Sequence, residues 1–314
     1  MLEAVPHSLA TLLRERREGA VRALVRGVGY ALAQGGSAEE FGRFLFDSYQ
    51  LAGEFERRLK LEGQRNGAAF TARHTVTRWG WCDDVQVRTV EDGFLVESAS
   101  MLLDQSDVLG FHGVTRMDME ACMETFWRLS GQALGLEVTY TVGADRDWAV
   151  IRSPGAGQVE PVSETVFDDD TLAAHRRLAL ATGITSSIGL AKQNGDEPEE
   201  FGFFFYQVWE KSGHYDRLRE RWGYGNALAY AENLAKSRQV LYTQTELFED
   251  LDGYTIASPS WATEIPQIMG TFGCLPDDVY RYYVGGGIPA CAKLGLQYAD
   301  QSDDRTHRVW IRSR

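Results

Sequence analysis

The 314-residue sequence has no long hydrophobic run, few cysteines and fewer basic than acidic side chains. Residues 1–27 scatter five arginines among their apolar residues, so they resemble neither a signal peptide nor a membrane-spanning segment. The 32 Lys and Arg against 45 Asp and Glu give a formal net charge of −13, which disfavours contact with phosphate backbones. We therefore expect a cytoplasmic protein that binds neither nucleic acid nor a membrane.

Sequence motifs for metals, nucleotides and common nucleophiles are also missing. The four cysteines form no CxxC pair, which excludes a zinc ribbon and a disulfide scaffold and predicts free thiols. The chain contains no GxxxxGK[ST], GxSxG, HExxH or GxGxxG pattern, so no P-loop, nucleophile elbow, zincin helix or dinucleotide fingerprint is indicated. We expect no cofactor and no bound metal.

The most informative feature present is an internal repeat with an offset of about 160 residues. The aligned motifs are Glu39–Phe44 with Glu199–Phe204, Asp92-Gly93 with Asp252-Gly253, Leu134–Leu136 with Leu294–Leu296, and Ile151–Ser153 with Ile311–Ser313. Because many separate motifs agree at one offset, we infer a tandem duplication. The predicted domains are residues 1–153 and 171–314, joined by a linker at 154–170 and related by pseudo-twofold symmetry.

Each copy begins with segments that favour helix. Residues 8–33 and 170–193 are rich in Leu and Ala and contain no Pro. A second helix is expected after Ser37, where Ser37 and Glu40 can form a capping box, and Pro198 stands at the matching first helical position. A third helix is expected at about 66–76 and 226–237.

The second part of each copy indicates strands. The Asp-Gly pairs at 92–93 and 252–253 lie between alternating apolar residues, which is a hairpin signal. A further helix then begins after Thr115, or at Pro276 in the second copy, and two strands close each copy. The predicted fold class is α+β, with each copy ordered ααα-ββ-α-ββ and its helices packed against an antiparallel sheet.

The order of elements resembles a known group of domains. A hairpin, then a helix ending in a small-residue turn, then two closing strands across Phe126–Arg152 is similar to the vinyl-reductase-type ligand-binding domain and its relatives known as L-2-amino-thiazoline-4-carboxylate hydrolases. The resemblance implies a small-molecule pocket. Those families tend to carry cysteines near the end, where this chain has Trp148-Ala149 and Trp310-Ile311, so no metal site or residue role is carried over.

Residues that differ between the copies are the candidates for chemistry, because shared residues are explained by shared fold geometry. The first copy alone carries His74, Cys82, Asp84 and His112. Histidine and cysteine exchange protons or attack carbon most readily near neutral pH. We predict these four as catalytic residues, with Cys82 or His112 as nucleophile or base and Asp84 orienting it. The alternative is that Cys82 is a small core residue, Asp84 is solvated and His112 is a surface loop residue without a catalytic role.

Aromatic residues and glycines supply the candidate substrate-binding positions. Alternation along Trp79–Asp84 would place Trp79, Trp81 and Asp83 on one face of a strand, opposite Cys82 and Asp84. In the second copy, three glycines and a proline replace a good helix at 284–289. Glycine costs about 1 kcal/mol and proline about 3 kcal/mol in a helix interior, so the helix is expected to break there. The predicted binding residues are Trp79, Trp81, Tyr282, Tyr283, Gly285 and Gly286; the alternative for the glycines is a decayed loop without a task.

The composition suits an apolar pocket, with eight Trp, thirteen Tyr and fifteen Phe. We predict an enzyme, of hydrolase or lyase type, that acts on a small cyclic or aromatic molecule by cofactor-independent acid-base chemistry. A non-catalytic small-molecule binding or sensing protein is the first alternative, and an interaction scaffold is the second. Apart from the small molecule, a homodimer is the one partner that the sequence leaves open.

Overall fold

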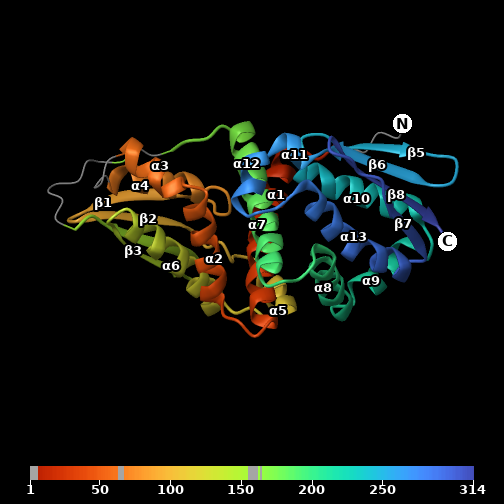
Figure 1. Ribbon diagram of the computed structural model, residues 1–314, viewed down its shortest axis with the longest axis horizontal. Coiled ribbons are helices and arrows are strands. Elements are labelled where there is room, and N and C mark those ends of the chain that lie inside the picture. Colours follow the sequence, from red (N-terminus) through yellow and green to blue (C-terminus); the bar gives the residue numbers. More distant parts are fainter. Residues whose placement is uncertain (1–5, 63–66, 155–161, 163–164) are drawn as a thin grey trace. The chain divides into compact units, whose positions relative to one another are not determined.

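The chain forms two compact units, each of which is α+β. The computed structural model describes residues 6–62, 67–154, 162 and 165–314. One unit, Arg16–Ser187, is called the middle unit here; the other, Met1–Glu15 with Ile188–Arg314, is called the C-terminal unit. Each has its own four-stranded antiparallel sheet (Figure 1). The predicted α+β class is confirmed.

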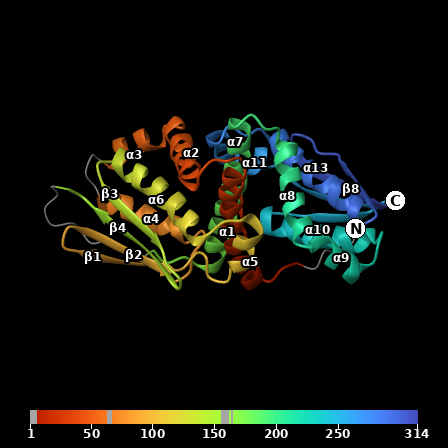
Figure 2. The same cartoon turned by 90° about the horizontal axis from the view of Figure 1, so that it is seen from below.

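The middle unit contains two long helices and a helix-covered sheet. Its elements are α1 (Leu9–Ala33, which begins before the unit), α2 (Ala38–Leu51), α3 (Glu54–Glu62), α4 (Gly67–Arg78), β1 (Gln86–Val90), β2 (Gly93–Ala99), α5 (Ser106–His112), α6 (Arg116–Ala133), β3 (Glu137–Val142), β4 (Arg146–Arg152) and α7 (Asp169–Gln193, which ends after the unit). Its strand order is β1-β2-β4-β3. Helices α4 and α6 pack on the sheet, and α2 packs on α6 (Figure 2).

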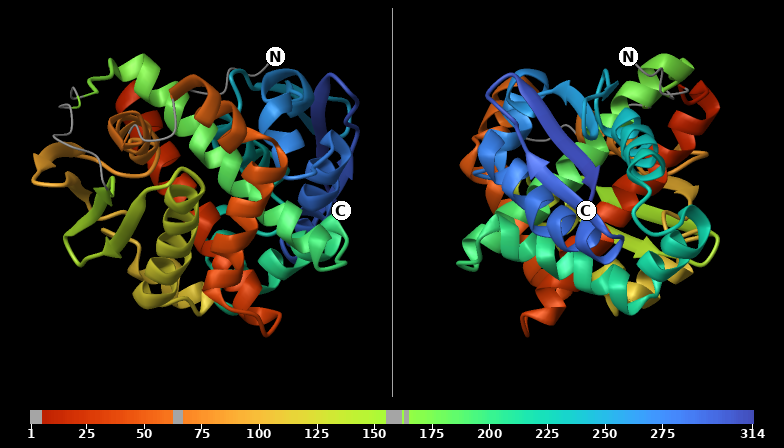
Figure 3. Two further views of the ribbon diagram at one scale, coloured as in Figure 1. Left: turned by 60° about the vertical axis from the view of Figure 1, so that its left-hand side comes forward. Right: turned by 90° about the vertical axis from the view of Figure 1, so that its right-hand side faces the viewer.

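The C-terminal unit repeats this plan. Its elements are α8 (Pro198–Lys211), α9 (His214–Trp222), α10 (Ala227–Leu241), β5 (Glu246–Glu249), β6 (Tyr254–Pro259), α11 (Trp261–Glu264), α12 (Pro266–Thr271), α13 (Pro276–Lys293), β7 (Leu296–Asp300) and β8 (Thr306–Ser313). The strand order is β5-β6-β8-β7. Helices α10 and α13 pack on the sheet and α8 packs on α13 (Figure 3).

Helix caps, first-turn prolines and hairpin turns occur at the residues that the sequence predicts. Ser37 and Glu40 form a complete capping box at the start of α2, and Thr115 and Asp118 form one at α6. Pro198 and Pro276 are the first residues of α8 and α13. Both Asp-Gly pairs join paired antiparallel strands, so the two predicted hairpins are confirmed.

The order ααα-ββ-α-ββ omitted several short helices. Helix α3 and its counterpart α9 precede the third predicted helix, and α5, α11 and α12 follow the hairpins. Helix α3 is short and highly charged, so the hydrophobic period gave little signal for it. The Glu54–Arg58 and Glu54–Arg57 ion pairs support it, and its Phe55 packs on Phe46. The predicted boundaries stay a prediction, because residues 155–161 and 163–164 of the linker lie outside the described residues.

The predicted break at the glycine run was wrong. Helix α13 is continuous through Gly285, Gly286, Gly287 and Pro289. A Cβ atom on Gly285 would lie 2.0 Å from the carbonyl oxygen of Glu199 on α8, so the missing side chain lets the two helix backbones touch. Tertiary packing against α8 therefore offsets the low helix propensity of this segment. No helix within the described ranges has the length and hydropathy that crossing a membrane requires.

Candidate functional site

His74 is fully buried on α4. Its ring packs edge-on against Trp127, with 4.2 Å between centroids, and Phe70 and Tyr140 lie nearby. Neither ring nitrogen has a hydrogen-bond partner in the described part of the chain. Burial, and then the positive charge of Arg78, lower its pKa well below the usual value, so the imidazole is neutral at pH 7. The cavity beside it measures only about 70 Å³.

Cys82 and Asp84 lie in different surroundings. Cys82 is buried, and burial raises the pKa of its thiol to about 11, so the thiolate is scarce at neutral pH. Asp84 is exposed, and it accepts hydrogen bonds from Arg146 at 2.7 Å and Gln86 at 2.8 Å, which lower its pKa. The carboxylate of Asp84 is therefore engaged at the surface and does not orient the thiol.

His112 lies at the end of the short helix α5 rather than in an exposed loop. It is only 7% exposed, and it packs against α1 at Gly29, where a Cβ atom would come within 3.0 Å of the His112 Cβ. Burial, with a smaller effect of Arg26, lowers its pKa to about 3. Its helix was missed because α5 is too short to show a hydrophobic period.

The four predicted catalytic side chains therefore lie in different surroundings. His74 and Cys82 both lie close enough to Arg78 for its charge to affect their pKa values, whereas Asp84 and His112 have other neighbours. Among the described residues, no group of three or more His, Cys, Asp and Glu is arranged to hold a metal. The catalytic roles stay a prediction.

The segment 79–84 is a turn that follows α4, because β1 begins only at Gln86. The predicted strand alternation was therefore wrong. The Trp79 ring meets Phe167 edge-on, with 6.3 Å between centroids. Trp81 borders an apolar cavity of about 190 Å³, together with Leu24 and Leu178. The two tryptophans thus have separate neighbours in the middle unit.

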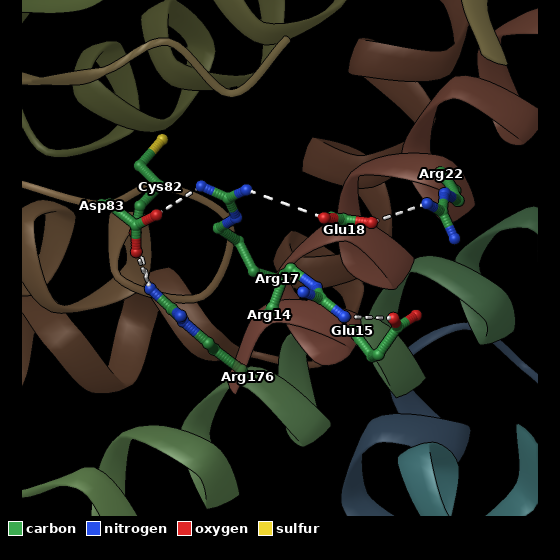
Figure 4. A network of polar contacts seen from close by, with 8 residues as sticks. All are labelled: Arg14, Glu15, Arg17, Glu18, Arg22, Cys82, Asp83 and Arg176. Atoms are coloured by element: carbon green, nitrogen blue, oxygen red, sulfur yellow. Dashed lines mark hydrogen bonds and ion pairs between the residues drawn. The ribbon is translucent and has the colours of Figure 1, made fainter. Parts of the chain in front are cut away.

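Asp83 joins the two long helices of the middle unit. Its carboxylate accepts from Arg17 on α1 and, at 2.5 Å, from the buried Arg176 on α7 (Figure 4). Arg176 also donates to the backbone oxygens of Trp79 and Cys82, both at 3.1 Å. The Cys82 side chain points away from this carboxylate (Figure 4). These contacts give Asp83 a structural role that holds the 79–84 turn on α7.

A second cavity, of about 200 Å³, lies in the C-terminal unit and is lined by residues of α8, α9, α10, α13 and β7. We call it the tyrosine cavity because six of its lining residues are Tyr206, Tyr215, Tyr230, Tyr282, Tyr283 and Tyr298. Trp209 and Phe205 add further rings, and Arg238 is the one ionised side chain among the described lining residues. A cavity of 150 Å³ holds benzene, so this one has room for a single ring with a small substituent.

Of the four predicted binding residues on α13, three line the tyrosine cavity and one does not, and neither Trp79 nor Trp81 lines it. Tyr282, Tyr283 and Gly286 border it. The ring of Tyr282 lies against Phe201 at 5.5 Å between centroids, which fixes it between α8 and α13. Gly285 instead faces the backbone of α8. Gly285 thus allows the close crossing of α8 and α13, and Gly286 lines the cavity beside that crossing.

Arg238 lines the tyrosine cavity and contacts His307, which does not belong to the cavity lining. Arg238 on α10 is 4% exposed and donates to the backbone oxygens of Ile256 at 3.2 Å and His307 at 2.8 Å. It also lies 2.7 Å from His307 Nε2. His307 on β8 is fully buried, with its Nδ1 2.5 Å from the Tyr242 hydroxyl. Burial, and then Arg238, lower the pKa of His307 well below the usual value.

Sequence reasoning missed Arg238, His307 and Tyr298. A signal for the last two existed in the differences between the copies, since His307 aligns with Asp147 and Tyr298 aligns with Val138; Arg238 aligns with Arg78 and gave no such signal. Gly287 aligns with Trp127, and a Cβ on Gly287 would lie 2.8 Å from the Tyr298 ring. The Tyr298 ring on β7 therefore lies against Gly287 of α13, at the position where the first copy has the Trp127 side chain. Recognising this exchange required knowing which helix faces which strand.

Comparisons with known proteins give little further information. The chain is 26% identical over 131 residues to the uncharacterized protein YxnB of Bacillus subtilis (strain 168). That match covers 41% of this chain and 82% of that protein. No family model matches the sequence. No solved structure matches the chain either.

Proposed function

We propose that the protein binds a small aromatic molecule in the tyrosine cavity without converting it. The observation that carries this proposal is the cavity itself, which measures about 200 Å³ and is lined by residues that include six tyrosines and one buried arginine. Aromatic walls with few placed polar groups are typical of ligand pockets. The alternative of a hydrolase or lyase that uses His74, Cys82, Asp84 and His112 gains no support from three buried groups and one surface ion pair.

A cavity-filling substitution tests the binding proposal. Leu241 lines the tyrosine cavity, and the aligned residue in the first copy is Trp81, so Leu241→Trp places a larger ring in the cavity at a position that holds one elsewhere in the chain. Calorimetric titration of the full chain with benzyl alcohol and benzamide should give saturable binding, with Kd about millimolar or tighter for such small ligands. Leu241→Trp should weaken it about tenfold or more.

The matched control is Leu228→Trp on the same helix. Leu228 is 37% exposed and does not belong to the cavity lining, so the control variant should bind as the unchanged chain does. Absence of binding by every probe, or equal weakening in the two variants, would overturn the proposal. Circular dichroism on each variant shows whether its fold is kept.

We also propose that the chain is a tandem duplication of one α+β domain, with the predicted pseudo-twofold relation between the copies. Equivalent contacts support the duplication. Arg78 donates to Val96 O at 2.8 Å, and Arg238 donates to Ile256 O. The two donors are 160 positions apart, and so are the two acceptors. The 131 matched residues make up 82% of YxnB, which gives that protein a length of about 160 residues, the length of one copy. The resemblance to vinyl-reductase-type domains is compatible with this reading and stays a proposal.

A further inference from the structure

Two buried arginines hold the same place in the two units. Arg78 and Arg238 lie at the end of α4 and near the end of α10, and each donates to the backbone oxygen of the strand beneath it. They are 0% and 4% exposed. A guanidinium stays charged at this depth, so each needs compensating negative charge or dipoles.

The two arginines differ in the charge that faces them. In the middle unit, burial lowers the pKa of Arg78, but Tyr140, Cys82 and the buried Asp147 together raise it above its usual value. That carboxylate is held by hydrogen bonds from the Ser100 hydroxyl at 2.8 Å and the Met101 N–H at 2.8 Å. In the C-terminal unit, His307 stands in the position of Asp147. The internal carboxylate has been replaced by an imidazole.

The imidazole of His307 is neutral because of its hydrogen bonds. Arg238 has only N–H donors, so His307 Nε2, at 2.7 Å, must accept and carries no proton. The proton is therefore on Nδ1, which donates to the Tyr242 hydroxyl at 2.5 Å. An imidazole with one proton carries no charge and cannot neutralise Arg238.

Arg238 thus has unused donors and forms no ion pair with a carboxylate of the described residues. Its three hydrogen bonds, to two backbone oxygens and one imidazole, use at most three of its five N–H groups. No described carboxylate pairs with it. Because Arg238 also lines the tyrosine cavity, an anionic group bound there would meet a desolvated cation among aromatic rings.

We propose that the tyrosine cavity selects an aromatic carboxylate, whose ring lies among the tyrosines and whose carboxylate binds Arg238. This inference rests on the proposed binding function and adds the chemical class of the ligand. A single ring bearing one carboxylate has the size that the cavity accepts.

The test compares benzoate with benzamide, a neutral analogue of the same shape, by calorimetric titration of the full chain. We expect benzoate to bind about tenfold tighter or more, as a charge-assisted bond to a buried arginine implies. Equal affinities, or tighter binding of benzamide, would overturn the inference while leaving the binding function standing. If neither probe binds, the binding function fails and the inference fails with it.

A substitution taken from the chain's own repeat separates the charge from the shape of the site. His307→Asp introduces the carboxylate that the middle unit has at Asp147, so benzoate affinity should fall to that of benzamide, with benzamide affinity unchanged. His307→Asn, which adds no charge, should keep the preference for benzoate. The inference is overturned if a folded His307→Asp variant retains that preference; should this variant not fold, the comparison of the two probes on the unchanged chain decides.

Discussion

At the scale of single residues, burial decides what the reactive side chains can do. His74 and His307 are fully buried and His112 is 7% exposed, and all three have lowered pKa values. Cys82 has a raised pKa for the same reason. The sequence identified residue types that are able to carry chemistry, but the depth at which each side chain is buried depends on neighbours far along the chain. Residue types alone therefore could not distinguish a reactive histidine from a buried neutral one.

These histidines predict acid sensitivity. An unfolded histidine takes up a proton near pH 6.5, whereas the folded His74, His112 and His307 do not, so the unfolded state binds more protons at lower pH. The contribution of each neutral histidine to the free energy of unfolding should be fully present above pH 6.5 and should decrease below it. Between pH 7.5 and 5.5 the decrease should be about 1.4 kcal/mol per histidine. Urea unfolding at the two pH values measures this difference. A free energy of unfolding that does not fall between them would contradict the neutral assignment.

His74→Leu provides the control for that dependence, because the aligned residue in the second copy is Leu234. The variant should lose about 1.4 kcal/mol of the pH-dependent change. At pH 7.5 it should gain about 1 kcal/mol, since it removes two buried nitrogens that have no hydrogen-bond partner among the described residues.

Two adjacent aspartates should differ in their contribution to stability. Asp83→Asn weakens the contacts with Arg17 and the buried Arg176, so we expect a loss of about 2 kcal/mol. Asp84→Asn affects only an exposed pair with Arg146 and should cost about 0.5 kcal/mol or less, because asparagine also tolerates the positive φ of 51° there. Urea unfolding of both variants at pH 7.5 provides the comparison, and equal losses would contradict the structural role of Asp83.

At the scale of elements, caps and turns could be predicted from the sequence, whereas tertiary compensation could not. The capping boxes at Ser37 and Thr115 and both Asp-Gly hairpins depend on residues within a few positions, so local reasoning found them. The continuity of α13 depends on α8, which lies more than 70 residues earlier. The low helix propensity of the glycine run predicted a break in α13, but the close packing of α13 on α8 keeps the helix continuous.

The helix crossing predicts opposite effects for two glycine substitutions. Gly285→Ala would bring a Cβ to 2.0 Å from the Glu199 carbonyl oxygen, so it should destabilise the protein by about 3 kcal/mol despite its better helix propensity. Gly270→Ala on α12 meets nothing within 4 Å and should be neutral or stabilising by up to about 1 kcal/mol. Chemical denaturation distinguishes them, and a stabilised Gly285→Ala variant would contradict the crossing.

At the scale of the whole molecule, one arrangement of elements occurs twice with different interiors. Both sheets have the same strand order, and both units carry a buried arginine on the helix that precedes the hairpin. In the middle unit Trp127 is buried at the position that Gly287 holds in the other. The repeat was visible in the sequence, but the tyrosine cavity was not, because it is made by residues from five elements. We therefore propose that ligand binding takes place in the C-terminal unit, where Gly287 stands at the position of Trp127.

The most direct test of that account is a crystal structure of the full chain soaked with 4-bromobenzamide, in which anomalous scattering locates the bromine. We expect a bromine peak inside the tyrosine cavity, among Tyr282, Tyr283 and Tyr298. A peak elsewhere with the cavity empty of ligand, or no peak at a concentration above the solution Kd, would contradict it.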